Sequence, residues 1–193
     1  MSEPVLTVAN QLTILRMALA PFLVVMVLQR EFTWALVLFV VAALTDMLDG
    51  YIARHGQQKT TLGAVMDPIA DKILLSSAFI VLTWSAGLTL RIPQWLTVLA
   101  LSRDVLILLT GALINLTSGW RIFQPSLLGK LATGAQLLTA GVVLLLNALG
   151  SDLAAVQWLF RGVLALILAS ALHYVYLAST GKGLRSRAVE GGE

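Results

Sequence analysis

The chain consists of long apolar runs separated by short polar breaks. A helix that spans a membrane needs about 20 predominantly apolar residues, within a range of roughly 17–25. The pattern predicts six such spans, at residues 12–29, 34–53, 64–85, 94–116, 127–148 and 155–178. Arg16 and Pro21 interrupt the first run, so residues 4–16 are alternatively an interfacial amphipathic helix that leads into a short span. Short connections favour antiparallel neighbours, and we therefore predict six transmembrane helices in one bundle.

The composition of the chain agrees with a lipid environment. Of its 193 residues, 58% are hydrophobic and 12% are charged, and the mean hydropathy is +0.88. A soluble domain carries about 25% charged residues. We therefore expect an all-α integral membrane protein that forms a single domain over residues 1–193, with its core at residues 5–178 and a basic tail at residues 179–193.

Cysteine content and charge exclude some functions and indicate an orientation. The chain has no cysteine, which excludes disulfides and thiolate metal sites, and its net charge of +3 is too small to suggest nucleic-acid binding.

Six spans put both termini on one side, where the basic residues are Arg54, Lys59, Arg121, Lys130, Lys182, Arg185 and Arg187. The basic residues of the other side are Arg30, Arg91 and Arg161. The positive-inside rule then predicts that both termini and the connection at residues 54–63 face the cytoplasm, and we expect a bacterial cytoplasmic (inner) membrane.

Four aspartates lie near the facing ends of the second and third apolar runs. Asp46 and Asp49 are three residues apart, and Asp67 and Asp71 are four apart, so each pair shares one face of a helix. A short polar connection joins the two runs, so all four carboxylates can converge, where they would repel each other in a low dielectric. Divalent cations would balance this charge, and oxygen ligands favour Mg²⁺, Mn²⁺ or Ca²⁺. Pairing with arginines, or binding the coupling ion of a cation transporter, is the alternative interpretation.

The residues between the aspartates indicate a ligand in addition to the metal. Gly50 and Ala53 follow the first acidic pair, and Gly63 lies one turn before Asp67. Small side chains at these positions leave the helix surface open, so that a bulky ligand can approach the backbone. Arg54 adds a permanent positive charge suited to phosphate. Metal, arginine and open backbone together predict a pyrophosphate site.

These residues form one continuous motif. From Asp46 to Asp71 the chain reads D-x2-D-G-x2-A-R-x8-G-x3-D-x3-D, which resembles, without a departure, the signature of the CDP-alcohol phosphatidyltransferases. The resemblance extends to NQLTILR at residues 10–16, SRDVLI at residues 102–107 and PSLLGKLATGAQ at residues 125–136, and it covers about residues 5–178.

This resemblance implies a reaction, its cofactor and its partners. Members of that family transfer a phosphatidyl group from a CDP-linked lipid, usually CDP-diacylglycerol, to an acceptor alcohol and release CMP. The implied ligands of two Mg²⁺ or Mn²⁺ ions are Asp46, Asp49, Asp67 and Asp71. The residues implied to bind the CDP-lipid are Gly50, Ala53, Arg54 and Gly63. The resemblance further implies that Asp71 is the general base on the acceptor hydroxyl, and that the protein forms a homodimer among membrane lipids.

The acceptor site is sought among basic residues outside the motif. The residues that we expect to bind an acceptor phosphate are Arg103, Arg121 and Lys130. Arg103 is alternatively part of a structural ion pair with Asp104, and the other two are alternatively interfacial side chains. Lys72 adjoins Asp71 but faces a different direction on a helix, so we interpret it as structural.

Two branches of the family differ in their acceptor. Gly129-Lys130 resembles the bacterial phosphatidylglycerophosphate synthases, which use glycerol 3-phosphate. SRDV at residues 102–105, together with Ala132 where those enzymes carry a second lysine, resembles the eukaryotic-type cardiolipin synthases, which use phosphatidylglycerol. We take glycerol 3-phosphate as the first expectation and phosphatidylglycerol as the alternative.

Overall fold

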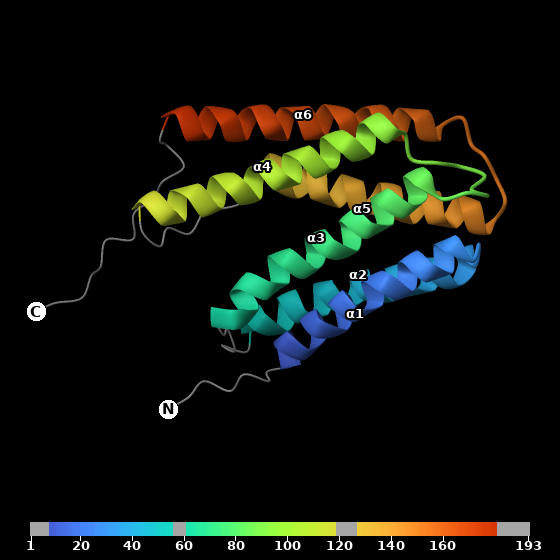
Figure 1. The fold of residues 1–193 in the computed structure, drawn as a ribbon, viewed down its shortest axis with the longest axis horizontal. Helices are drawn as coiled ribbons and strands as arrows, with labels where there is room; N and C mark the ends of the chain where they lie inside the picture. The colour runs from blue at the N-terminus through green and yellow to red at the C-terminus, as the bar shows by residue number, and fades with distance from the viewer. Residues whose placement is uncertain (1–7, 56–60, 119–126, 181–193) are drawn as a thin grey trace, which may run out of the picture.

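The computed structural model describes residues 8–55, 61–118 and 127–180, and these residues form helices and no strand (Figure 1). The helices are α1 (Val8–Leu28), α2 (Phe32–His55), α3 (Thr61–Trp84), α4 (Gln94–Ser118), α5 (Leu127–Ala148) and α6 (Val156–Thr180). Each helix coincides with one of the six predicted apolar runs, and most ends lie within two or three residues of the expected ones. The prediction of an all-α fold is therefore confirmed.

The first helix is longer than its apolar run, because α1 continues from Val8 through Arg16 and Pro21 to Leu28. Its buried residues recur every three or four positions and are Thr13, Arg16, Ala20, Leu23 and Val27. This stripe packs against α2 and α3, while Pro21 lies on the exposed side. Packing along the whole stripe explains why the helix persists although a proline removes one backbone hydrogen bond. Residues 8–16 are thus part of one helix, and residues 4–7 of the expected interfacial segment lie outside the described part.

Consecutive helices run antiparallel, so each end of the bundle collects a defined set of helix termini (Figure 1). One end, which we call the site end, holds the starts of α1, α3 and α5 and the ends of α2, α4 and α6. The opposite end, the turn end, holds the connections α1–α2, α3–α4 and α5–α6. α1 packs against α2 and α3, α5 packs against α2, α3 and α6, and α4 packs against α3 and α6.

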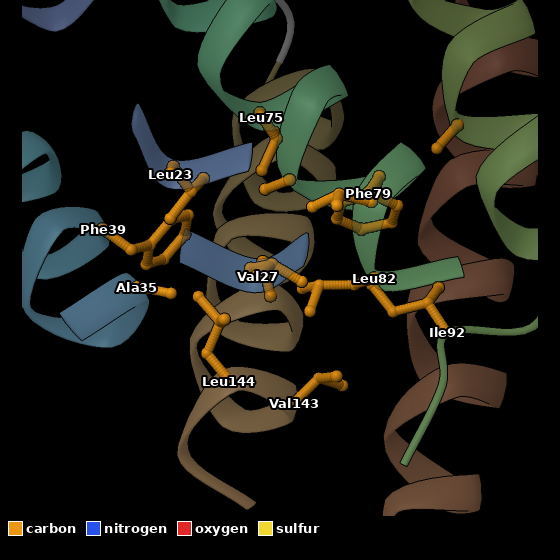
Figure 2. Packing of buried hydrophobic residues seen from close by; sticks show 14 of the residues in the cluster. Leu23, Val27, Ala35, Phe39, Leu75, Phe79, Leu82, Ile92, Val143 and Leu144 are labelled. Atoms are coloured by element: carbon orange, nitrogen blue, oxygen red, sulfur yellow. The ribbon is translucent and has the colours of Figure 1, made fainter. Parts of the chain in front are cut away.

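The apolar core fills the half of the bundle toward the turn end. Figure 2 shows side chains from four of the helices converging there, among them Leu23, Val27, Phe39, Phe79, Leu82 and Leu144. On the site-end side of this core, α1, α4, α5 and α6 bury the polar or charged residues Arg16, Arg103, Gln136 and Ser170, and α3 carries the partly exposed Asp71. The fold therefore places its main apolar core toward the turn end, with the buried charged residues Arg16, Arg103 and Asp104 on the site-end side of that core.

Two side-chain contacts hold the connections at the turn end. The Asn147 amide oxygen accepts hydrogen bonds from the backbone of Thr89 and Leu90 at 2.8 and 3.2 Å, and its nitrogen donates to the Leu90 carbonyl at 2.8 Å. Arg30 and Gly87 both have left-handed backbones, with φ of 65° and 83°. A Cβ atom at Gly87 would lie only 2.4 Å from Arg30 Nε, so the guanidinium rests directly on the glycine backbone. These contacts tie the α3–α4 connection to α5 and to the α1–α2 turn.

The outer surface of the helices is apolar. Each of the six helices exposes large hydrophobic side chains, for example Phe22, Trp34, Ile80, Leu106, Leu138 and Leu172. Within the described residues, α5 and the segment Val156–Tyr174 of α6 are long and apolar enough to cross a membrane, and shorter apolar stretches occupy Thr13–Leu28 and Phe32–Thr45. Six helices are confirmed, whereas the crossing of the bilayer by all six stays a prediction.

Candidate active site at the junction of α2 and α3

The backbone brings the two halves of the acidic motif to the same end of the bundle. Asp46 and Asp49 lie in the last three turns of α2, and Asp67 and Asp71 lie in the first three turns of α3. Both segments belong to the site end, where α2 ends and α3 begins (Figure 1). The motif residues whose side chains lie outside the described part are Asp46, Asp49, Gly50, Ala53, Arg54, Gly63 and Asp67. The convergence of all four carboxylates therefore stays a prediction.

Asp71 is the motif aspartate whose side chain is described, and it forms an ion pair with Arg16 of α1. Arg16 donates a hydrogen bond from Nη1 to Asp71 Oδ1. The arginine is 1% exposed, whereas the Asp71 side chain is 43% exposed and so accessible from the site end. Arg16 itself indicated such a pair, because a cation inside an apolar run requires a counter-charge. Its partner is 55 residues away, which no local spacing predicts.

The residue after Asp71 contacts a different helix. Lys72 Nζ lies 2.5 Å from Asp104 Oδ1 on α4. Consecutive helical residues are separated by about 100° around the helix axis, so Asp71 and Lys72 face different neighbours. The two ion pairs therefore connect α3 to α1 on one side and to α4 on the other.

Arg103 is buried and extensively bonded, rather than directed into an open site. Its Nη1 donates to Asp104 Oδ1 at 2.9 Å and to Thr133 Oγ1 at 3.4 Å. Its Nη2 donates to the Gly129 carbonyl at 3.1 Å and to Ser170 Oγ at 3.0 Å. These bonds join α4 to α5 and α6 and support the structural alternative for Arg103.

Of the other two residues expected to bind the acceptor, the structure describes Lys130 and does not describe Arg121. Lys130 is exposed on the first turn of α5, directly after the Gly129 carbonyl that Arg103 binds. Arg121 lies outside the described residues. Arg103 and the backbone beside Lys130 are thus brought together, while the roles of all three residues stay predictions.

One buried polar residue near this site is absent from the sequence-based predictions. Gln136 on α5 is 1% exposed, and neither its amide nitrogen nor its amide oxygen has a hydrogen-bond partner in the part of the chain that is described. Buried polar groups in native proteins are nearly always bonded. A lone glutamine within an apolar run gave no spacing signal that could have marked it.

The chemistry of the acidic set fits a hard divalent cation. All four motif side chains offer carboxylate oxygens, which Mg²⁺ and Mn²⁺ prefer, and the described Asp71 carboxylate is accessible. No group of three or more potential metal ligands occurs among the described side chains. Three of the four motif aspartates have side chains outside the described part, so the metal site stays a prediction that rests on the placement of the backbone and on the chemistry of the carboxylates.

Comparison with known proteins identifies the family. Residues 6–176 match the CDP-alcohol phosphatidyltransferase family, and the chain belongs to it. The family is membrane-associated, generally depends on a divalent metal, and uses CDP-diacylglycerol and an alcohol acceptor. The resemblance deduced from the motif is therefore confirmed.

Individual relatives fall into two groups by name. The chain is 36% identical over 158 residues to a probable cardiolipin synthase (CMP-forming) of Drosophila melanogaster, an alignment covering 74% of this chain and 48% of that protein. It is 33% identical over 170 residues to a cardiolipin synthase (CMP-forming) of Streptomyces coelicolor, covering 83% and 77%. It is 30% identical over 154 residues to a CDP-diacylglycerol–glycerol-3-phosphate 3-phosphatidyltransferase of Bacillus subtilis, covering 72% and 76%. The chain thus spans about half the length of the Drosophila relative.

Proposed function

We propose that this protein is a phosphatidyltransferase that moves the phosphatidyl group of CDP-diacylglycerol to an acceptor alcohol and releases CMP. The observation that carries the proposal is the complete acidic motif, divided between the end of α2 and the start of α3 at one end of the bundle. The family match over residues 6–176 supports it. A cation transporter, the alternative from another class, has no need of glycines at positions 50 and 63 or of Arg54 between the acidic pairs.

The proposed roles follow the motif. The metal ligands are Asp46, Asp49, Asp67 and Asp71, and the residues that bind the CDP-lipid are Gly50, Ala53, Arg54 and Gly63. Two bound Mg²⁺ or Mn²⁺ ions would neutralise the pyrophosphate and the departing CMP. A carboxylate oxygen of Asp71 takes the proton of the acceptor hydroxyl. The hydroxyl oxygen then bonds to the phosphorus that carries diacylglycerol, and the bond from that phosphorus to CMP breaks.

Two acceptors are proposed, each supported by a separate observation. Glycerol 3-phosphate is the first, supported by Gly129-Lys130 and by the Bacillus relative. Phosphatidylglycerol is the second, supported by SRDV at residues 102–105, by Ala132 and by the Drosophila and Streptomyces relatives. Arg103, Arg121 and Lys130 are the basic residues proposed near the acceptor, with Arg103 acting through the helices that it joins.

We further propose a single domain of six transmembrane helices that forms a homodimer in a bacterial cytoplasmic membrane. Apolar side chains exposed on every helix support the six spans, and the excess of basic residues at the site end supports a cytoplasmic active site and termini.

One reconstitution tests the reaction and its metal. The purified protein is given CDP-diacylglycerol and Mg²⁺ or Mn²⁺, with glycerol 3-phosphate or phosphatidylglycerol supplied separately, and CMP and the lipid product are identified by mass spectrometry. We expect CMP release only when metal and acceptor are both present, abolished by EDTA and restored by excess metal. Product identity decides the acceptor. Cation flux in vesicles without CMP release would instead support the transporter.

A further inference from the structure

Two cations, one from α3 and one from α4, share one buried carboxylate toward the site end. Asp104 Oδ1 lies 2.5 Å from Lys72 Nζ and 2.9 Å from Arg103 Nη1. Among the described side chains, these two cations and one anion give the cluster a formal charge of +1. In the low dielectric of a membrane bundle, an uncompensated positive charge is costly and favours binding of an anion.

Arg103 and Lys72 are not equally free to bind an anion. Arg103 is 4% exposed and holds four hydrogen-bond partners across α4, α5 and α6. Turning it toward a ligand would break four hydrogen bonds inside the bundle at once, including those to the Gly129 carbonyl and the Ser170 hydroxyl. Arg103 is therefore a fixed part of the scaffold.

Lys72 has the opposite properties. Its side chain is 23% exposed, compared with 4% for Arg103, and its ammonium is a point charge on a flexible stem. If Lys72 turns away, Asp104 still keeps its hydrogen bond from Arg103. Lys72 can thus leave the cluster without leaving a buried charge unpaired.

We propose that Lys72 binds the phosphate of the acceptor. This lysine then has a role in substrate binding in addition to its structural ion pair with Asp104. The inference rests on the proposed function and adds to it. Asp71 and Lys72 leave the same turn of α3 about 100° apart, and both side chains are partly exposed. Once Lys72 turns away from Asp104, an acceptor that lies over this turn would meet the Asp71 carboxylate with its hydroxyl and the Lys72 ammonium with its phosphate. Glycerol 3-phosphate and phosphatidylglycerol both carry the required phosphate. The monoester bears more negative charge and therefore depends more on Lys72.

The test separates acceptor binding from donor binding in full-length protein. For Lys72→Met we expect the KM for the acceptor to rise by about tenfold or more, as for the loss of a charge-assisted hydrogen bond. The KM for CDP-diacylglycerol should change less than about twofold, and Lys72→Arg should recover most of the loss. The rise should be greater with glycerol 3-phosphate than with phosphatidylglycerol. Arg161→Met, which removes an exposed cation near the turn end, serves as the matched control and should leave both KM values unchanged.

A binding measurement covers the case in which a variant is poorly active. Glycerol 3-phosphate should raise the thermal stability of the wild-type protein in detergent and should not raise that of Lys72→Met. If the Lys72→Met variant does not fold, Lys72→Gln is measured in its place. An unchanged acceptor KM, or an equal rise in both KM values, overturns the role of Lys72. A wild-type protein that releases no CMP with either acceptor overturns the proposed function instead.

Discussion

Arg16 and Asp71 depend on each other unequally. Arg16 is enclosed by α1 and its neighbours, whereas nearly half of the Asp71 side chain is exposed. A buried cation that loses its counter-ion destabilises a protein strongly, while an exposed carboxylate that loses its partner is stabilised by water. Asp71 is therefore important for the fold as well as for the proposed proton transfer.

Replacing Asp71 by asparagine should reveal both contributions. We expect Asp71→Asn to lower the rate of CMP release by at least about 100-fold, because an amide cannot take the proton of the acceptor hydroxyl. The same change should lower the free energy of unfolding by about 1–3 kcal/mol, because the buried charge of Arg16 loses the carboxylate of Asp71 as a counter-ion. Activity is measured with CDP-diacylglycerol, and stability by thermal unfolding in detergent.

The control for this substitution is Asp152→Asn, an identical chemical change at an exposed residue between α5 and α6. It should leave both quantities unaltered. Wild-type activity in Asp71→Asn would contradict the general-base role. Unaltered stability would show that the remaining contacts of Arg16 suffice to hold its charge.

For individual residues, local spacing predicted the motif but did not predict the ion pairs and hydrogen bonds that hold the motif and its neighbours in place. The aspartates, glycines and Arg54 recur at intervals that a single stretch of chain displays. Arg16–Asp71 and Arg103–Ser170 join residues 55 and 67 positions apart. Their pairing depends on which helices pack together, and one sequence does not contain that information.

Among the helix connections, the contact between Arg30 and Gly87 gives the clearest constraint. Gly87→Ala would force an L side chain into a left-handed backbone, which costs about 1–2 kcal/mol. The new Cβ would also displace the guanidinium of Arg30. We expect Gly87→Ala to lower the thermal stability, and to do so less in an Arg30→Ala background, where the backbone strain alone is left. Thermal unfolding of the wild type, Gly87→Ala, Arg30→Ala and the double variant separates the backbone strain from the displacement of the guanidinium.

The matched control is Gly162→Ala in α6. A Cβ at Gly162 would meet no heavy atom within 4 Å, and alanine is the better helix former by about 1 kcal/mol. This variant should be as stable as the wild type or more stable. Equal effects of the two glycine substitutions would contradict the special role of Gly87.

The helices themselves could be predicted because apolar runs of span length are separated by polar breaks. The exception is the start of α1, where Arg16 suggested a boundary that does not exist. Arg16 lies in the buried stripe and pairs with Asp71, so its charge stabilises the helix rather than ending it. A charged residue in an apolar run is therefore a poor marker of a helix end when the counter-charge lies on another helix.

For the whole molecule, the position of the main apolar core beside the buried charged residues explains how a membrane bundle can hold a charged site. The apolar core, to which all six helices contribute, fixes the helices toward the turn end, and the ion pairs of Asp71, Lys72 and Arg103 lie beyond it. The family could be predicted from the motif because the donor chemistry is encoded in one stretch. The acceptor could not, because the basic residues concerned lie on four different segments of the chain.

The orientation of this arrangement can be measured directly, because the chain contains no cysteine. Leu127 is 79% exposed at the site end, and Asp152 is exposed at the turn end. With six spans and a cytoplasmic site end, a membrane-impermeant maleimide should label Asp152→Cys in bacterial spheroplasts and should label Leu127→Cys only after permeabilisation. Detergent-solubilised samples of both variants control for reactivity. Labelling of both cysteines in intact spheroplasts would mean that α5, the helix between them, does not cross the bilayer as proposed. The reverse pattern would place the active site outside the cytoplasm.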